Sequence, residues 1–502
     1  MCGCFFDFTA DDAYIITRYA ENLTRGHGLV FNPGERINAL TCPLLAFVEA
    51  GLYKLTGRTI LAYKLLSILL VFAGHAICLR YLRQFQEASW LYCAFVVPSP
   101  LVALWTVGGM ETPLLLFLLT AASILCLRIL EKGICTRSAT GLSILLGLCF
   151  LARHDSALFC APLALALIVR YRRRTGWLVV PAGLIAAAWL LFALWYFHDL
   201  FPTSYYIKKP VWLWYEVKRN VAYLAQFLLL SGLGWILIWA LVRIGTNTAE
   251  SGRAVVRHVQ RAWGLYAGIL CVAGYALLVA TKHMMFSYRM LVPYLPVFGV
   301  ALMSLHAVAR AGGPALNKRS PVLVASMVGM LAGQIWLARE IDRVSMNPGF
   351  VGEYARCGRR SYVRGFARAL RDSADAIRKH WENHPQRDSR RPTISTFAAG
   401  ITPYYLPEGY FYETLVSHRH ARPFHRKDVA DRADYLMIMA PEHGPLEAQV
   451  APNLLGRLVV VAAYEFEFDG RRNRIYVFHN PHPKTYCLPP EVDGPIDHPY
   501  SH

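Results

Sequence analysis

Residues 111–130 read ETPLLLFLLTAASILCLRIL, with charged side chains only at Glu111 and Arg128. An α-helix needs about 20 predominantly apolar residues to cross the hydrocarbon core of a bilayer, and this stretch has that length. Further long apolar runs lie at about 60–79, 90–107, 139–152, 156–169, 177–197, 221–242, 262–281, 287–309 and 321–338. The chain is therefore predicted to be a polytopic α-helical membrane protein.

The composition of the 502-residue chain supports this prediction. Hydrophobic residues make up 55% and charged residues 17%, against roughly 25% charged residues in ordinary soluble domains. The formal net charge is +19, and residues 1–344 hold 31 Lys and Arg against 15 Asp and Glu, whereas residues 345–502 hold 21 against 18. The excess positive charge thus lies with the apolar part. These properties exclude a disordered chain and a nucleic-acid protein built on a basic soluble domain.

Charge in the loops between the apolar runs predicts how the chain crosses the membrane. Alternate loops are basic: residues 80–89, 128–138, 170–176, 243–261 and 310–320. The positive-inside rule places these loops in the cytoplasm, so residues 1–42 and 345–502 are expected outside.

Two features near the N-terminus bear on this topology. The apolar run 43–55 is short and contains Glu49 and Lys54, so we expect an interfacial helix there rather than a span. Residues 1–42 would be exported without a preceding helix, and we therefore expect a first transmembrane helix to be missing ahead of Met1.

The sequence after Val344 predicts a soluble α/β domain at 345–502, following a transmembrane domain at 1–344. Apolar positions recur at helical spacing within residues 353–384. Strand-like runs follow: TISTFAAG at 393–400, DYLMIMA at 434–440, LVVVAAYEFEF at 458–468 and RIYVFHN at 474–480. With the topology above, this domain is extracytoplasmic.

Two adjacent carboxylates, Asp11 and Asp12, open an amphipathic segment that reads DDAYIITRYAENLTRGHG. One interpretation is structural, with Asp11 as a helix N-cap and Asp12 as a favourable acid in the first turn. The other is catalytic, with one carboxylate as a general base and its neighbour as an orienting group or a ligand to a divalent metal. Both stay open for the pair alone, and the polar residues predicted on the same side favour the second.

Those further polar residues are Glu111, Arg153, His154, Asp155, Tyr205, Tyr206, Lys208, His283 and Arg289. Ordinary alternatives exist: Arg153 as a snorkelling side chain with a local salt bridge, and the tyrosines with Lys208 as an interfacial belt. Arg289 is different, because it lies inside an apolar run and needs an acidic partner, such as Glu111, or an anionic ligand. Convergence of several loops on one face is how an active site is built on a helical scaffold.

Several segments resemble, in the same order, landmarks of the GT-C glycosyltransferases, membrane enzymes that use polyprenyl-phosphate sugars. The run DDAYIITRYAENLTRGHGLVFNPGERINALTCPL at 11–44 is similar to their first external loop, and most similar to that of the mycobacterial terminal arabinofuranosyltransferase subgroup. Further similar segments are GGMETPLL at 108–115, LARHDSALF at 151–159, FPTSYYIKK at 201–209, FSYRMLVPYLPV at 286–297 and AAGITPYYLP at 398–407. The chain departs from the subgroup's pattern at His154, Ser156, Thr203, Ser204 and Met290.

The resemblance implies roles for the candidate residues. Asp11 is implied as the catalytic base with Asp12 beside it, and the implied donors to the leaving lipid phosphate are Arg153, Tyr205, Tyr206, Lys208 and Arg289. Glu111, His154, Asp155 and His283 are expected to contact the substrates. No resident cofactor is required, and a divalent metal at Asp11 and Asp12 stays open.

The resemblance also implies the reactants and their location. The donor is a polyprenyl-phosphate sugar. Arabinofuranose is the first expectation for the sugar, and a hexose or an aminopentose is the alternative. The acceptor is a cell-envelope glycan, lipid or protein, and no nucleic acid is involved. The expected location is the cytoplasmic membrane, with the active site on its outer side.

Two other functions stay open. A transporter or flippase of lipid-linked sugars would place polar residues at mid-membrane, often in related repeats, whereas the candidates here gather at one face. A non-catalytic assembly protein would instead bind a partner through its external domain.

Overall fold

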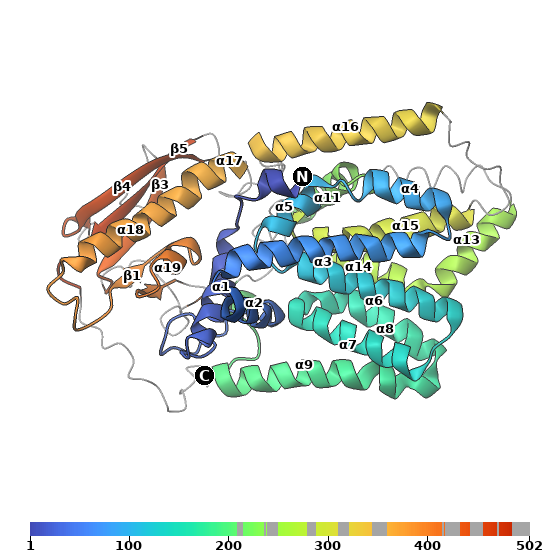
Figure 1. Ribbon diagram of the computed structural model, residues 1–502, viewed down its shortest axis with the longest axis horizontal. Helices are drawn as coiled ribbons and strands as arrows, with labels where there is room; N and C mark the ends of the chain where they lie inside the picture. The colour runs from blue at the N-terminus through green and yellow to red at the C-terminus, as the bar shows by residue number, and fades with distance from the viewer. Residues whose placement is uncertain are drawn as a thin grey trace.

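The computed structural model describes residues 1–207, 214–234, 237, 249–278, 288–309, 321–343, 359–413, 416, 432–441, 455–468 and 471–483. A bundle of helices forms one end of the long axis, and a smaller part with a β-sheet forms the other (Figure 1). The fold is that of a polytopic helical membrane protein with a C-terminal soluble domain, as predicted.

Most of the predicted apolar runs coincide with helices of the bundle. They are α3 (Thr59–Leu82), α4 (Gln86–Phe95), α5 (Pro100–Val107), α6 (Thr112–Lys132), α7 (Thr136–Ala152), α8 (Ala157–Arg170), α9 (Thr175–Phe197), α11 (Trp214–Leu230), α14 (Trp263–Leu278), α15 (Leu295–Ala309) and α16 (Pro321–Arg343). A further helix, α13 (Ala249–Arg261), falls in the predicted basic loop 243–261. The run 90–107 is not one span, because it is divided between α4 and α5. Pro98 lies in the break and Pro100 takes the first position of α5, where a missing N–H does no harm.

Three helices in the described part of the chain are long and apolar enough to cross a membrane: Thr59–Leu82, Thr112–Lys132 and Arg172–Phe197. A fourth span is formed if Gly252–Arg261 and Trp263–Leu278, which are bent by 79° relative to each other, count as one. Shorter apolar helices, such as Thr136–Ala152, pack beside them.

The helix α6 lies in the interior of the bundle, whereas α9 lies at its edge. Within the most apolar 18 residues of each helix, 78% are buried in α6 and 17% in α9. Figure 1 shows α9 at the edge of the bundle. An exposed apolar face on a membrane helix contacts lipid. Trp177 and Trp195 are 50% and 71% exposed near the two ends of α9, as is typical of aromatic residues at membrane interfaces.

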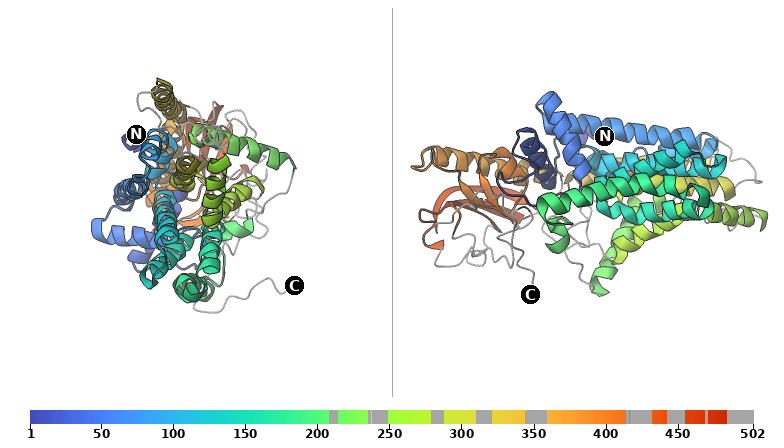
Figure 2. Two further views of the ribbon diagram at one scale, coloured as in Figure 1. Left: turned by 90° about the vertical axis from the view of Figure 1, so that its right-hand side faces the viewer. Right: turned by 90° about the horizontal axis from the view of Figure 1, so that it is seen from below.

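The predicted first loop, residues 1–42, contains α1 (Asp11–Thr24), and the short helix predicted at 43–55 appears as α2 (Pro43–Thr56). Pro43 lies in the first turn of α2, and Gly57 ends it in a left-handed conformation with φ of 66°, which glycine adopts readily. The two helices lie where the bundle meets the sheet (Figure 2). The first loop is thus placed to contact both parts.

The C-terminal part contains a five-stranded mixed sheet in the order β2-β1-β3-β5-β4. The strands are β1 (Thr393–Ser395), β2 (Tyr410–Tyr412), β3 (Tyr435–Pro441), β4 (Val459–Phe468) and β5 (Arg471–His479). β1 pairs in parallel with β2 and β3, whereas β5 is antiparallel to β3 and β4. Four of these strands were predicted, and β2 was not.

The helix predicted within 353–384 appears as α17 (Arg359–Ser361), a π-helical segment (Tyr362–Ala367) and α18 (Arg368–Glu382). α18 packs along the sheet (Figure 1) and buries Leu370, Ala374, Ile377 and Trp381. Burial of this apolar stripe is the main force that holds the helix on the sheet.

Candidate active site

Asp11 and Asp12 are neighbours in α1, but their carboxylates have different partners. The Asp11 carboxylate accepts hydrogen bonds from two backbone amides of the C-terminal domain, Gly400 N at 3.2 Å and Ile401 N at 2.7 Å. The Asp12 carboxylate accepts a hydrogen bond from Nη1 of Arg289 at 3.0 Å. The pair therefore joins the start of α1 to two distant segments.

The interpretation of Asp11 as a helix N-cap is wrong. The N-cap of α1 is Ala10, and no side chain caps the helix. Both aspartates lie in the first turn, where an acid still interacts favourably with the helix dipole. The amides that bind Asp11 come from residues 389 and 390 positions later in the chain, so the contact is tertiary.

The environment of Asp11 suits a proton acceptor. Burial raises the pKa of Asp11 to about 7, and the charges of Asp12 and Glu413 act in the same direction. The two amide hydrogen bonds oppose this shift, because they stabilise the ionised form. A carboxyl group with a pKa near neutrality is well matched to general-base catalysis. An ionised carboxylate has about four lone-pair sites, so Asp11 can accept a further hydrogen bond from a hydroxyl.

A chain of ion pairs runs from Asp12 through two arginines. Arg289 also donates through Nη2 to both carboxylate oxygens of Glu111, each at 3.2 Å. Arg153 donates to Oε1 of Glu111 at 3.1 Å and to the two oxygens of Asp155 at 2.8 and 2.9 Å. Glu111, expected as the partner of Arg289, is therefore shared by both guanidinium groups.

The exposure of the side chains differs along this series of ion pairs. Only 2% of the Glu111 side chain is exposed, against 12% for Arg153, 18% for Arg289 and 49% for Asp12. Nε of Arg289 is buried and has no hydrogen-bond partner among the described residues. A buried donor without a partner is costly in a protein by itself. The exposed end of this series of ion pairs thus combines an accessible carboxylate with an arginine whose Nε–H has no partner in the described part of the chain.

The residue before Arg289 has an unusual backbone conformation. Tyr288 has a φ of 57°, which is uncommon for a bulky residue and costs roughly 1–3 kcal/mol. Its ring is fully buried, 4.8 Å from that of Tyr223 and 5.7 Å from that of Phe227, and its hydroxyl donates to Gln226 at 3.2 Å. This packing fixes the turn from which Arg289 extends.

Gly108 and Gly109 allow the start of α1 to pack next to Glu111. The carbonyl of Gly108 accepts a hydrogen bond from Ala10 N at 3.0 Å. Gly109 has a φ of +77°, and a Cβ there would lie 3.0 Å from that of Ala13. The GGME sequence thus brings Glu111 and the two aspartates to the same end of the bundle.

The remaining candidates lie as follows. Tyr205 and Tyr206 belong to α10 (Thr203–Ile207), with their ring centroids 5.6 Å apart, and Tyr205 is 64% exposed. The His154 ring lies 4.8 Å from that of Phe150, and its Nε2 is buried without a hydrogen-bond partner among the described residues. Lys208 and His283 lie outside the described residues.

Sequence reasoning missed Arg18, Gly400 and Ile401 as site-building residues. Arg18 lies on the apolar stripe of α1, four residues after Tyr14. A charge on an apolar stripe was the available signal, since it requires buried partners. Nothing in the sequence pairs Gly400 with Asp11.

The divalent metal left open above for Asp11 and Asp12 stays a prediction, and the structure shows protein groups bound to both carboxylates. Asp11 is bound by amides and Asp12 by a guanidinium group. Within the ranges that the structure describes, no group of three or more His, Cys, Asp or Glu side chains is placed to hold a metal ion.

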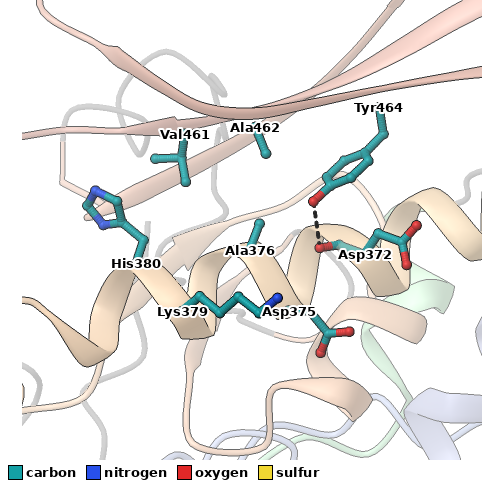
Figure 3. A pocket seen from close by; sticks show the side chains of 8 residues that line it. All are labelled: Asp372, Asp375, Ala376, Lys379, His380, Val461, Ala462 and Tyr464. Carbon is teal, nitrogen blue, oxygen red and sulfur yellow. Dashed lines mark hydrogen bonds between the residues drawn. The ribbon is translucent and has the colours of Figure 1, made fainter.

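A pocket of about 510 Å³ lies elsewhere, between α18 and β4, as Figure 3 shows. It is lined by Asp372, Asp375, Ala376, Lys379, His380, Val461, Ala462 and Tyr464. The Tyr464 hydroxyl donates to the carbonyl of Asp372 at 3.0 Å and closes one end. None of the predicted site residues lines this pocket.

Comparisons with known proteins identify the fold. No protein-family model matches the chain, and no curated protein matches it either. Two crystal structures are similar: ArnT from Cupriavidus metallidurans bound to undecaprenyl phosphate, with a TM-score of 0.57, and ArnT from the same organism in the apo state, with a TM-score of 0.52. Each is 12% identical over 94% of this chain and 95% of ArnT. The likeness spans both parts of the chain and shows a shared fold.

Proposed function

We propose that this protein is a GT-C glycosyltransferase that moves a sugar from a polyprenyl-phosphate donor to a hydroxyl group of a cell-envelope acceptor. The observation that carries the proposal is Asp11, a carboxylate with a pKa of about 7 that two backbone amides hold beside a cluster of arginines and acids. The ArnT fold supports it, because ArnT was crystallised with undecaprenyl phosphate, a polyprenyl phosphate.

In the proposed reaction the acceptor oxygen attacks the anomeric carbon of the donor sugar. The bond from that carbon to the phosphate oxygen breaks, and polyprenyl phosphate leaves with the bonding electrons. Asp11 takes the proton of the acceptor hydroxyl, so that charge and atoms balance. Attack from the side opposite the leaving phosphate inverts the anomeric configuration.

The leaving phosphate needs positive charge and hydrogen-bond donors. Within the described ranges, Arg289 supplies an Nε without a hydrogen-bond partner and an Nη1 bound to the exposed Asp12. Arg153, through its link to Glu111, fixes the position of Arg289 and adds a second cation. Tyr205, Tyr206 and Lys208 complete the proposed donor set. The polyprenyl chain would lie against the apolar surface of the helices.

The sugar and the acceptor are inferred from the resemblance of the first loop. The first candidate for the sugar is arabinofuranose, with a hexose or an aminopentose as alternatives. The acceptor is a glycan, lipid or protein of the cell envelope, and His154, Asp155 and His283 are proposed to contact it or the sugar. We place the site and the C-terminal domain on the outer side of the cytoplasmic membrane, because the basic loops 80–89, 128–138 and 170–176 lie at the end of the bundle away from the sheet (Figure 1).

A transporter of lipid-linked sugars is the second candidate, and the position of the charges argues against it. Glu111 precedes α6, and Arg289 lies before the short turn that opens α15. The ion pairs are thus at helix ends, whereas transporter sites lie near mid-membrane.

The test is release of polyprenyl phosphate by purified protein from synthetic polyprenyl-phosphate arabinofuranose, hexose and aminopentose, with a cell-envelope extract as acceptor. We expect release with one of these sugars and its loss in Asp11→Asn. Asp388→Asn is the control, since that side chain is 97% exposed. Sugar crossing a vesicle membrane still attached to its lipid would show a transporter, and no release from any donor would show that the proposal is wrong.

A further inference from the structure

The C-terminal domain reaches the start of α1 through a short helix, α19 (Ile401–Tyr405). We propose that this segment is part of the active site: the backbone amides of Gly400 and Ile401 orient the Asp11 carboxylate for proton transfer. This inference rests on the proposed function and gives the C-terminal domain a positioning role in it.

The two hydrogen bonds control the orientation of the Asp11 carboxylate. Gly400 N donates to Oδ2 at 3.2 Å, and Ile401 N donates to Oδ1 at 2.7 Å. Because each oxygen has its own donor, rotation of the carboxylate plane breaks at least one bond. A base held in this way keeps its free lone pairs in a fixed direction, as positioning of a reacting group requires.

Gly400 allows this approach because it has no side chain. A Cβ at this position would lie 1.8 Å from the backbone oxygen of Asp11 and 2.8 Å from its Oδ1. The φ of Gly400 is −104°, which other residues also adopt. Close contact with Asp11, rather than backbone conformation, is therefore what requires a glycine.

α19 is held from both sides. The Thr402 hydroxyl donates to the carbonyl of Leu370 in α18 at 3.1 Å. On the other side, the guanidinium of Arg18 donates to the carbonyls of Pro403 and Gly409, the latter at 3.0 Å. Arg18 is only 4% exposed, so these bonds form in a desolvated contact where they are strong.

The contact continues beyond α19 along the first loop. The Asn32 side chain donates to the carbonyl of Phe411 at 2.9 Å and accepts from its amide at 3.1 Å. The Tyr410 hydroxyl donates to Glu35 at 2.9 Å. Asn32 and Glu35 are 1% and 4% exposed. Residues 400–411 and the first loop thus pack as one unit, which fixes the two amides relative to Asp11.

The test removes one amide hydrogen and keeps the fold. Ile401 is the first residue of α19, after the N-cap Gly400, so its N–H makes no hydrogen bond within the helix that proline would remove. Gly400 has αR backbone angles, which are disfavoured before proline, so a backbone ester at position 401 serves as a second variant. Ile401→Pro removes the N–H that bonds to Oδ1, whereas the matched control Ile401→Ala shortens the same side chain and keeps the N–H. The steady-state kinetics of both are measured with the synthetic donor that the wild type uses.

We expect kcat of Ile401→Pro to lie about 10- to 100-fold below that of Ile401→Ala, the scale of a misplaced catalytic group. The KM for the donor should be the same in both, because the proposed phosphate contacts lie elsewhere. Gly400→Ala, which keeps both amides but pushes them away from Asp11, should also lose kcat.

Equal kcat in the proline and alanine variants, or a difference confined to KM, would overturn the inference while leaving the proposed function intact. An inactive wild type would instead refute the proposed function itself. If Ile401→Pro does not fold, a backbone ester at position 401, introduced with the matching α-hydroxy acid, removes the same N–H and keeps the side chain. The same kcat loss is expected for the ester, and wild-type kcat would overturn the inference.

Discussion

Arg289 joins Asp12 to Glu111: Nη1 donates to Asp12 at 3.0 Å while Nη2 donates to both oxygens of Glu111 at 3.2 Å. The two acids differ in exposure, at 49% for Asp12 and 2% for Glu111. An anionic ligand can replace the exposed acid far more easily than the buried one, because an exposed ion pair has little net stability. The bond from Nη2 of Arg289 to Glu111 is therefore fixed, whereas Asp12 at Nη1 can be exchanged for an anionic ligand.

Replacement of Arg289 tests its role toward the donor phosphate. Arg289→Ala should lower kcat/KM for the lipid-phosphate donor by an amount equivalent to about 2–4 kcal/mol, by analogy with the loss of an oxyanion-hole donor. Arg289→Lys should recover only part of the activity, because an ammonium group lacks the planar fork that bonds two partners. Lys208→Ala is expected to act in the same direction. Wild-type donor kinetics in the alanine variants would remove these residues from the site.

Glu111 is expected to be structural as well as functional. Glu111→Gln leaves Arg153 and Arg289 without their shared charge, and breaking a buried ion pair costs about 3–5 kcal/mol. The measurement is thermal unfolding in detergent, with Glu382→Gln as the control because Glu382 is exposed at the end of α18. A similar Tm for both variants would show that the buried ion pairs contribute little.

Asp11→Asn separates catalysis from stability. Asparagine keeps the size of the side chain and removes its basicity, so transfer should fall roughly 100-fold or more, as for a lost general base. Asp12→Asn should be milder, since in the proposed site Asp12 only holds Arg289. Initial rates and thermal stability are measured on the same preparations. If both asparagine variants transfer sugar at the wild-type rate, the base must be sought at Glu111 or Asp155.

The pH dependence of transfer should report the raised pKa of Asp11. The base acts when ionised, so kcat/KM should rise with pH through about 7 and then level off. The charged and titratable groups that act on Asp11 in the described part of the chain include Asp12, Glu413 and Tyr362. In Asp11→Asn the residual activity should lack this rise, and a rise that persists there would assign the titration to another group.

Stability should change with pH in the opposite direction. The pKa of Asp11 lies at about 7 in the folded protein against 3.8 as the ordinary value, so the folded state binds this proton more tightly. The contribution is present below about pH 4 and is lost as the pH rises to about 7. The wild type should therefore lose stability relative to Asp11→Asn over this range, as measured by thermal unfolding at several pH values.

Topology can be tested by cysteine labelling of intact cells. Arg173 lies in a loop predicted to be cytoplasmic and Asp388 in the domain predicted to be external, and both side chains are exposed. In a background without Cys357, Cys487 and the cysteines that are exposed in the described part of the chain (Cys4, Cys93, Cys135 and Cys271), a membrane-impermeant maleimide should label Asp388→Cys and not Arg173→Cys. The reverse pattern would place the site in the cytoplasm.

Local patterns in the sequence predicted much of the fold. The apolar runs, the helical spacing before Trp381 and the alternating strands at 458–480 depend on neighbouring residues. They correspond to α3 to α9, α11, α14 to α16, α18, β4 and β5. The division of the run 90–107 had a local signal in Pro98 and Pro100, which hydrophobicity outweighed. β1 and β2 are both only three residues long, but β1 begins a longer apolar run at 393–400, whereas β2 has no such run around it.

The site was predicted less completely, because its contacts are long-range. The candidate residues Asp12, Glu111, Arg153, Asp155 and Arg289 do meet in one chain of ion pairs. The amides that hold Asp11 have no side-chain signature, since any residue supplies a backbone N–H. The close approach that requires Gly400 is a property of packing, which a single sequence does not reveal.

Arg18 and Pro403, which meet in the buried contact between α1 and α19, are 385 residues apart in the chain. A ribosome adds roughly 5–20 residues per second, so roughly 20–80 s pass between the synthesis of these two residues. Throughout that interval the nascent α1 is already made, while the amides of Gly400 and Ile401 do not yet exist. The contact that positions Asp11 in the proposed site can therefore form only as translation nears its end.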